Sequence, residues 1–222
     1  MTERVNMSDK EIISKTAAFV KAELLHAEGG HDWFHIERVW KNARRIAREE
    51  PVNLFIVELG ALLHDIADHK FHDGDESVGV LKARKFLQGL RVDVAVGDHV
   101  VKIMKNISFK GGNFSPGFFS LELAVVQDAD RLDAIGAIGI ARAFNYGGYK
   151  GREMYDPAVK PVAGMTVEQY QHSKAPTINH FYEKLLLLKD RMNTKTGRRM
   201  AEQRHRFLEQ YLEQFFREWD GN

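Results

Sequence analysis

The chain of 222 residues contains no cysteine. This absence excludes disulfide bonds, thiolate ligands for zinc and a thiol nucleophile. It fits a reducing compartment without requiring one. Any metal site in this protein must therefore be built from histidine, carboxylate or other oxygen ligands.

An excess of charge of one sign and a long apolar run are also missing. The 32 basic residues stand against 31 acidic ones, which leaves a net charge of +1 and no global electrostatic reason to bind nucleic acid or an anionic membrane. No stretch approaches the roughly 20 apolar residues of a membrane-spanning helix, and the first ten residues lack the apolar core of a signal peptide. We therefore expect a cytoplasmic protein that binds neither nucleic acid nor membrane.

Helical periodicity is what the chain has in abundance. Hydrophobic residues make up 44% and charged residues 28% of the sequence, which is ordinary for a globular protein large enough to bury a substantial core. Apolar side chains recur at helical spacing nearly throughout, and strand-like alternation is almost absent. The sequence predicts one all-α domain over 1–222, with helices at 8–25, 32–50, 51–66, 76–89, 92–107, 119–146 (with a break near Gly136), 178–190 and 194–219.

Several helix ends carry recognisable signals. Ser8 and Glu11 have the spacing of a capping box, and Asp32 is a suitable N-cap for the second helix. Pro51 can begin the third helix, because proline is tolerated in a first turn. That third helix is apolar on nearly every side, which predicts a place at the centre of the bundle.

A loop rich in glycine and proline is predicted at 147–176. It separates a bundle core at about 8–146 from C-terminal helices at 178–219, which we expect to pack on that core. Loops of about 30 residues are uncommon inside a compact domain and often serve as lids or binding segments.

Polar residues at the ends of apolar helices predict a metal site. His64 and Asp65 are adjacent, so their directions differ by about 100° around a helix axis, but at a helix end both can reach one ion. His35 lies in the first turn of another helix, and an acidic cluster follows at 127–133. Two imidazoles and two carboxylates would neutralise a divalent cation and leave positions open for water and substrate.

The pattern H…HD…D on an all-α background resembles the HD-domain metal-dependent phosphohydrolase superfamily. The resemblance implies the metal ligands His35, His64, Asp65 and Asp130, since the family aspartate is followed by one residue and then leucine. Asp128 and Asp133 are then expected to cap helices or form salt bridges. The segments similar to the YpgQ/YedJ-like bacterial subgroup, within a likeness that covers most of 8–215, are 30–39, 61–68, 107–109, 127–136 and 144–148.

That subgroup implies a nucleotide pyrophosphohydrolase, which converts a (d)NTP to a (d)NMP and pyrophosphate. The implied cofactor is one divalent ion, Mn²⁺ first, with Mg²⁺, Co²⁺, Ni²⁺, Fe²⁺ or Zn²⁺ as alternatives. Related nucleotidases carry an acidic residue three positions after the HD aspartate, which makes Asp68 the candidate to orient or deprotonate the attacking water. The candidates for contacts with phosphate or base are Lys105, Arg131, Tyr149 and Arg152.

Other functions are compatible with the same residues. A phosphomonoesterase or phosphodiesterase could use the same four ligands, and a redox di-iron enzyme would need two irons per chain. A non-catalytic helical module could keep the metal for structure alone. The expected partner is a small nucleotide, and the protein is expected to be a monomer or a homodimer.

Overall fold

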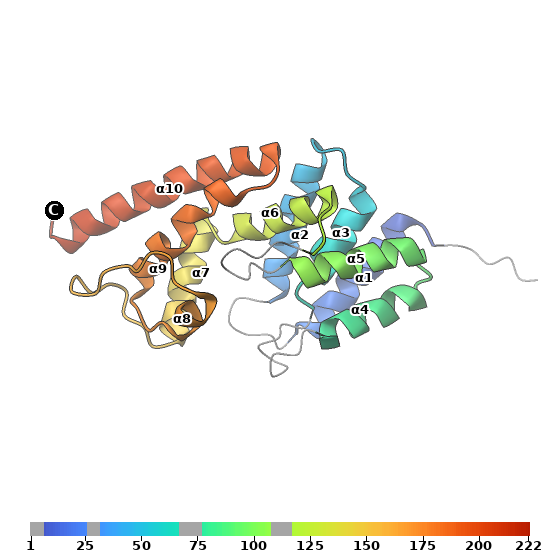
Figure 1. The fold of residues 1–222 in the computed structure, drawn as a ribbon, viewed down its shortest axis with the longest axis horizontal. Coiled ribbons are helices and arrows are strands. Elements are labelled where there is room, and N and C mark those ends of the chain that lie inside the picture. Colours follow the sequence, from blue (N-terminus) through green and yellow to red (C-terminus); the bar gives the residue numbers. More distant parts are fainter. Residues whose placement is uncertain (1–6, 26–31, 67–76, 108–116) are drawn as a thin grey trace, which may run out of the picture. The chain divides into compact units, whose positions relative to one another are not determined.

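The computed structural model describes residues 7–25, 32–66, 77–107 and 117–222 (Figure 1). Within these ranges all regular structure is helical and no strand occurs, which confirms the all-α prediction. The chain forms two compact units, with the division falling inside helix α6 (Leu121–Asp133) between Val126 and Gln127. That the two units act as a single domain stays a prediction.

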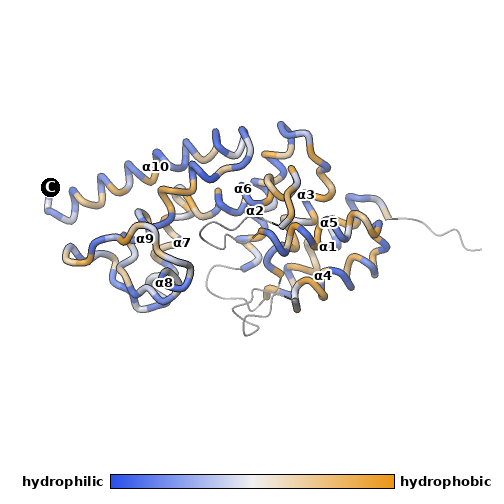
Figure 2. Tube along the Cα trace, in the orientation of Figure 1, coloured by the Kyte–Doolittle hydropathy of each residue, from blue (hydrophilic) through white to orange (hydrophobic). Residues whose placement is uncertain are grey.

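The first unit is built around α3, the shortest and most apolar of its complete helices. Helix α3 contacts α1, α2 and α5, and seven of its ten residues are buried. Orange, the colour of hydrophobic residues, dominates its trace in Figure 2. The complete helices of this unit are α1 (Asp9–Glu23), α2 (Trp33–Ala47), α3 (Leu54–Leu63), α4 (Ser77–Gly89) and α5 (Val94–Asn106).

Glycine at position 60 allows three helices to meet closely. A Cβ atom there would lie 3.2 Å from the side chain of Ile103 on α5 and 3.5 Å from that of Val126 on α6. A Cβ atom at this position would require the Ile103 side chain to shift by a few tenths of an ångström. The central position predicted for the third helix is therefore confirmed.

The helix ends follow the sequence signals at two of the three positions. The capping box of Ser8 and Glu11 is present, and the Asp32 carboxylate accepts the backbone N–H of His35 at 2.9 Å. The start predicted at Pro51 is wrong, because α3 begins at Leu54 with Asn53 as its N-cap. The Asn53 side chain accepts two backbone N–H groups of the first turn, which proline cannot do.

The second unit contains the remainder of the chain. The predicted break near Gly136 is confirmed, because α6 ends at Asp133 and Gly136 adopts a φ of +74°. The continuous helix predicted at 178–190 is wrong, since it ends early and two short 3₁₀ turns follow. The elements after α6 are α7 (Gly136–Tyr149), α8 (Val167–His172), α9 (Thr177–Glu183), η2 (Leu185–Leu187), η3 (Lys189–Arg191) and α10 (Lys195–Trp219).

The loop predicted at 147–176 is partly helical. Helix α7 continues through Gly147, where a Cβ atom would lie only 2.1 Å from the hydroxyl of Thr177. This glycine therefore permits close packing of α9 and does not end the helix. Helix α8 lies within the same segment, and Thr166 and Gln169 exchange side-chain and backbone hydrogen bonds at its start, as in a capping box.

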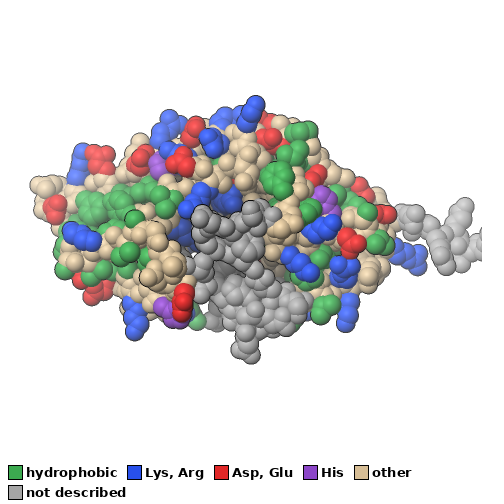
Figure 3. All heavy atoms as spheres, viewed as in Figure 1, with side chains coloured by type: hydrophobic (Ala, Val, Ile, Leu, Met, Phe, Trp, Pro, Cys, Tyr) green, Lys and Arg blue, Asp and Glu red, His purple; other side chains and the backbone are tan. Residues whose placement is uncertain are grey.

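Among the described residues, no helix has the length and apolar character that crossing a membrane requires. On the face drawn in Figure 3, basic and acidic side chains are interspersed over the described residues. This distribution agrees with the nearly balanced charge of the sequence.

Candidate metal centre

His35 is held in place by the start of α2. Its backbone N–H is accepted by the cap residue Asp32, and its side chain is buried, with 1% of the residue exposed. The His35 Nε2 atom lies 4.0 Å from Oδ2 of Asp65, and the rings of His35 and His64 are 5.4 Å apart, edge to face. The N-terminus of α2 and the C-terminus of α3 thus present three of the predicted ligands to one another.

His64 has a ring nitrogen without a partner. Its Nδ1 atom lies 2.8 Å from the backbone oxygen of Ala61, while Nε2 is buried and has no hydrogen-bond partner among the described residues. Because a carbonyl oxygen only accepts, Nδ1 carries the proton and Nε2 carries a lone pair. This is the arrangement that orients a histidine toward a metal ion, so the residues present fit a divalent cation.

Asp130 lies on α6, in the second unit. It lies one helical turn after Val126, the residue that approaches Gly60 of α3, and so continues the same face of the helix. That Asp130 shares one metal centre with His35 and His64 of the first unit stays a prediction. Asp65 stands beside His35 with 21% of its side chain exposed.

The two remaining aspartates of the acidic cluster have structural partners, as predicted. Asp128 is fully buried and accepts hydrogen bonds from the backbone of Asn193 and Thr194. Burial raises the pKa of the Asp128 carboxyl, and these hydrogen bonds oppose the rise. Asp133 pairs with Arg142 at 2.7 Å.

Two of the predicted substrate-binding residues are engaged by the protein itself. Arg131 donates to the backbone oxygen of Arg191 at 2.6 Å, and only 14% of its side chain is exposed. Arg152 donates to the backbone oxygen of Ser173 at 2.7 Å. These contacts could not be read from the sequence, because the acceptors are backbone carbonyls far along the chain.

The other predicted contacts remain on the surface. Lys105 is exposed in the last turn of α5, and Tyr149 is 63% exposed, with the Lys150 ammonium 5.2 Å from its ring centroid. The predicted catalytic residue Asp68 lies outside the described residues. Substrate contacts for these residues and for Arg131 and Arg152 stay a prediction.

Sequence reasoning missed the carbonyl oxygen of Ala61, which orients His64. A signal existed, because the last four carbonyls of a helix lack partners within that helix. A histidine at the C-cap of α3 is well placed to donate to one of them.

Comparison with known proteins identifies the family of this chain. The model of the HD domain family matches residues 33–135, a range that includes all four candidate ligands. The chain belongs to the HD domain family, as the sequence resemblance predicted, and has the fold of HD-superfamily hydrolases.

Within the family the chain is similar to YpgQ of Bacillus subtilis, with 38% identity over 216 residues and 97% of both chains covered. A solved HD-superfamily hydrolase from Bacillus thuringiensis is 45% identical, with a TM-score of 0.78, over 97% of this chain and 100% of that one. The structure of Bacillus subtilis YpgQ in complex with ADP matches with a TM-score of 0.76 and 36% identity, over 96% of this chain and 97% of that one.

Proposed function

We propose that the protein is a metal-dependent nucleotide pyrophosphohydrolase that converts a (d)NTP and water to a (d)NMP and pyrophosphate. The observation that carries the proposal is the buried, unpaired Nε2 atom of His64 next to His35. Membership in the HD family supports the hydrolase class. The complex of the similar YpgQ with ADP supports a nucleotide as the ligand.

The four side chains proposed to hold the metal are His35, His64, Asp65 and Asp130. We propose Mn²⁺, because mixed imidazole and carboxylate ligands suit it better than Mg²⁺, which prefers oxygen ligands and bound water. When bound, such an ion polarises a phosphate oxygen and lowers the pKa of a water molecule.

The protein's own contribution is to fix these ligands before substrate arrives. The Ala61 carbonyl holds the His64 ring in one tautomer and orientation. Burial and the Asp32 cap restrict His35 at the start of α2. Ligands that are already in place cost little further ordering when the reaction begins.

In the proposed reaction a water oxygen forms a bond to the α-phosphorus, and the bond from that phosphorus to the α–β bridging oxygen breaks. Asp68 is the residue proposed to orient the water and accept its proton. Pyrophosphate leaves with the bridging oxygen. Binding of the phosphates is assigned to Lys105, Arg131 and Arg152, and contact with the base to Tyr149.

The test uses metal-stripped protein reloaded with Mn²⁺ and a panel of dNTPs and NTPs, with products followed by phosphorus NMR. We expect monophosphate and pyrophosphate from wild type and neither product from His64→Ala or Asp65→Ala. His172→Ala and Asp190→Ala are matched controls, because both residues are exposed and lie outside the proposed ligand set. Both controls should retain wild-type turnover.

Four results would contradict the proposal. Free phosphate in place of pyrophosphate would identify a phosphomonoesterase, and turnover of diester substrates alone would identify a phosphodiesterase. Tight metal binding with no turnover of any nucleotide would favour the non-catalytic module. Two metal ions per chain would favour a dinuclear enzyme.

A further inference from the structure

The last turn of α6 carries two carboxylates, Asp130 and Asp133, at the end of the helix where the dipole disfavours negative charge. The last four carbonyl oxygens of a helix also lack partners within that helix. A turn of this composition frays easily unless other parts of the protein hold it. Because Asp130 is a proposed metal ligand, the groups that hold this turn bear on the metal centre.

Arg204 of α10 supplies one of these contacts. Its Nη1 atom donates to the backbone oxygen of Leu132, one of the carbonyls at the end of α6. The stem of the same side chain lies against Gly136, where a Cβ atom would come within 3.1 Å of Cβ and Cγ of Arg204. Gly136 has a φ of +74°, so glycine permits both the turn after α6 and the approach of the arginine. The guanidinium thus places positive charge where the dipole of α6 favours it.

A second arginine reaches the neighbouring carbonyl. Arg142 of α7 donates from Nη1 to the backbone oxygen of Asp133 at 3.3 Å and to its carboxylate at 2.7 Å. The side chain of Asp133 is 2% exposed, and a buried carboxylate needs such a partner. Guanidinium groups from two other helices therefore cap two consecutive carbonyls of α6. Since Arg142 also neutralises a buried carboxylate, Arg204 is the better residue to alter in a test.

We propose that Arg204 is a positioning residue of the candidate metal centre. By capping the Leu132 carbonyl, it keeps the last turn of α6 helical and holds the Asp130 carboxylate in one position before the ion binds. A carboxylate that is already in place loses less conformational entropy when it coordinates a metal. This inference rests on the ligand set of the proposed function and does not depend on the identity of the substrate.

The Mn²⁺ affinity of the full-length protein, measured by electron paramagnetic resonance of the free ion, tests this role without relying on turnover. We expect Arg204→Met to weaken Mn²⁺ binding by roughly tenfold, the effect typical of losing a group that orients a metal ligand. Arg204→Lys should restore most of the affinity, because an ammonium can still donate to a carbonyl. Arg198→Met is the matched control, since Arg198 is exposed on the same helix, and it should bind Mn²⁺ as wild type does.

A double-mutant cycle shows whether the arginine acts through the carboxylate. Asp130→Asn should weaken Mn²⁺ binding, because it removes a proposed ligand. The combination of Asp130→Asn with Arg204→Met should bind no more weakly than Asp130→Asn alone. An equal effect of Arg204→Met with and without the Asp130 carboxylate would overturn the inference.

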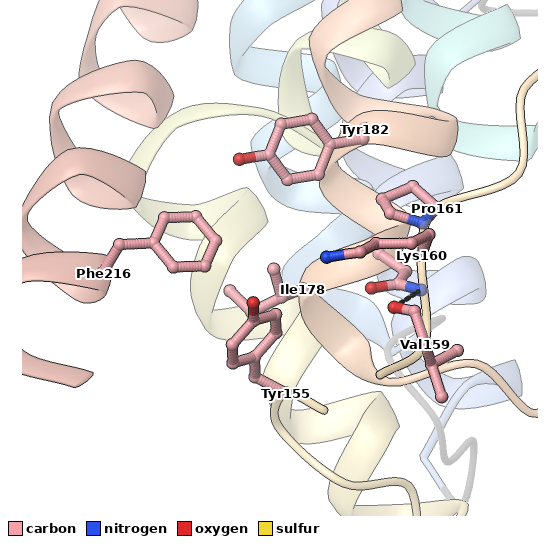
Figure 4. A pocket seen from close by; sticks show the side chains of 8 residues that line it. Tyr155, Val159, Lys160, Pro161, Ile178, Tyr182 and Phe216 are labelled. Atoms are coloured by element: carbon pink, nitrogen blue, oxygen red, sulfur yellow. Dashed lines mark hydrogen bonds between the residues drawn. The ribbon is translucent and has the colours of Figure 1, made fainter. Parts of the chain in front are cut away.

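Ile178→Val is the control for a loss of stability alone. Ile178 is 1% exposed on α9 and lines a pocket with Tyr155 and Phe216 (Figure 4), and no residue of α6 lines that pocket. Loss of a buried methyl group should lower the melting temperature and leave the Mn²⁺ affinity unchanged. A loss of Mn²⁺ affinity as large as in Arg204→Met would show that the arginine acts through stability and would overturn the inference.

The design separates failure of this inference from failure of the proposed ligand set. If Arg204→Met binds Mn²⁺ as wild type does while Asp130→Asn binds weakly, the inference is wrong and the ligand set stands. If Asp130→Asn itself binds as wild type does, Asp130 is not a ligand and both are wrong. Binding by Arg204→Lys that is no tighter than binding by Arg204→Met would also contradict the role given to the arginine.

Discussion

Thr194 donates two hydrogen bonds to the same carboxylate oxygen of Asp128, one from its backbone N–H and one from its hydroxyl, each at 2.8 Å. The same hydroxyl accepts the backbone N–H of Gly197 at 2.9 Å, so Thr194 is also the N-cap of α10. A buried carboxylate on α6 therefore fixes the point at which the longest helix begins.

Removal of that carboxylate should destabilise the protein strongly. In Asp128→Ala the N–H groups of Asn193 and Thr194 lose their acceptor inside the protein, and Arg131 loses a partner. We expect the free energy of unfolding to fall by about 3–5 kcal/mol, as when one member of a buried polar network is removed. Urea denaturation at pH 7 measures this change. Asp190→Ala is the control, since Asp190 is exposed on η3, and a loss no larger than in that control would contradict the prediction.

Two glycine substitutions should have different effects on stability. Alanine is the better helix former by about 1 kcal/mol, but at Gly197 its Cβ atom would lie 2.4 Å from Oδ2 of Asp128. Gly197→Ala should therefore lower the melting temperature. At Gly148, on α7, nothing lies within 4 Å of the added atom, so Gly148→Ala should be neutral or stabilising. Thermal unfolding of both variants tests this, and equal shifts would refute the role given to the Asp128 contact.

The candidate metal centre could be predicted from the sequence because its signals are local. His35 follows a capping aspartate, and His64 ends an apolar helix. Both histidines are buried. Once these segments are recognised as helices, the histidines are expected at buried helix ends. A buried polar side chain needs a polar partner or a ligand, because burial without one is costly.

The parts that sequence reasoning missed depend on contacts between distant segments. Asp128 and Thr194 are 66 positions apart in the sequence, and the spacing of apolar residues gives no sign that they form a hydrogen bond. Gly147 and Gly148 look like helix breakers, yet α7 continues through both because Thr177 packs against the first of them. Packing of this kind overrides local helix propensity.

His180 should make stability depend on pH. Burial, followed by the positive charges of Lys184 and Arg152, lowers the pKa of His180 from 6.5 to about 3. Between these values the unfolded chain binds a proton that the folded chain does not. The stabilising contribution is thus complete above pH 6.5 and is lost as the pH falls toward 3.

We therefore expect the free energy of unfolding of wild type to drop by about 1–2 kcal/mol from pH 7 to pH 5 through this group. His180→Gln should show a smaller drop, because glutamine does not titrate. Chemical denaturation of both proteins at the two pH values measures the difference. His172→Gln, a change at an exposed histidine, should keep the wild-type drop. Identical drops in wild type and His180→Gln would show that this histidine does not titrate as its surroundings imply.

Mn²⁺ should stabilise the folded protein through the candidate centre. An ion that binds only the folded state adds about 2.7 kcal/mol to the free energy of unfolding when present at 100 times its dissociation constant. Removal of metal with EDTA should abolish this gain in wild type. His64→Ala should show little or no gain, because it lacks the buried Nε2 atom that has no other partner among the described residues.

The comparison needs a histidine that lies outside the centre. His172 is exposed on α8, so His172→Ala should keep the full Mn²⁺-dependent gain. Thermal unfolding of wild type, His64→Ala and His172→Ala, with and without Mn²⁺, measures Mn²⁺ binding without relying on enzymatic turnover. If His64→Ala is stabilised by Mn²⁺ as much as wild type, His64 is not a ligand. The unpaired nitrogen beside His35 would then need another explanation.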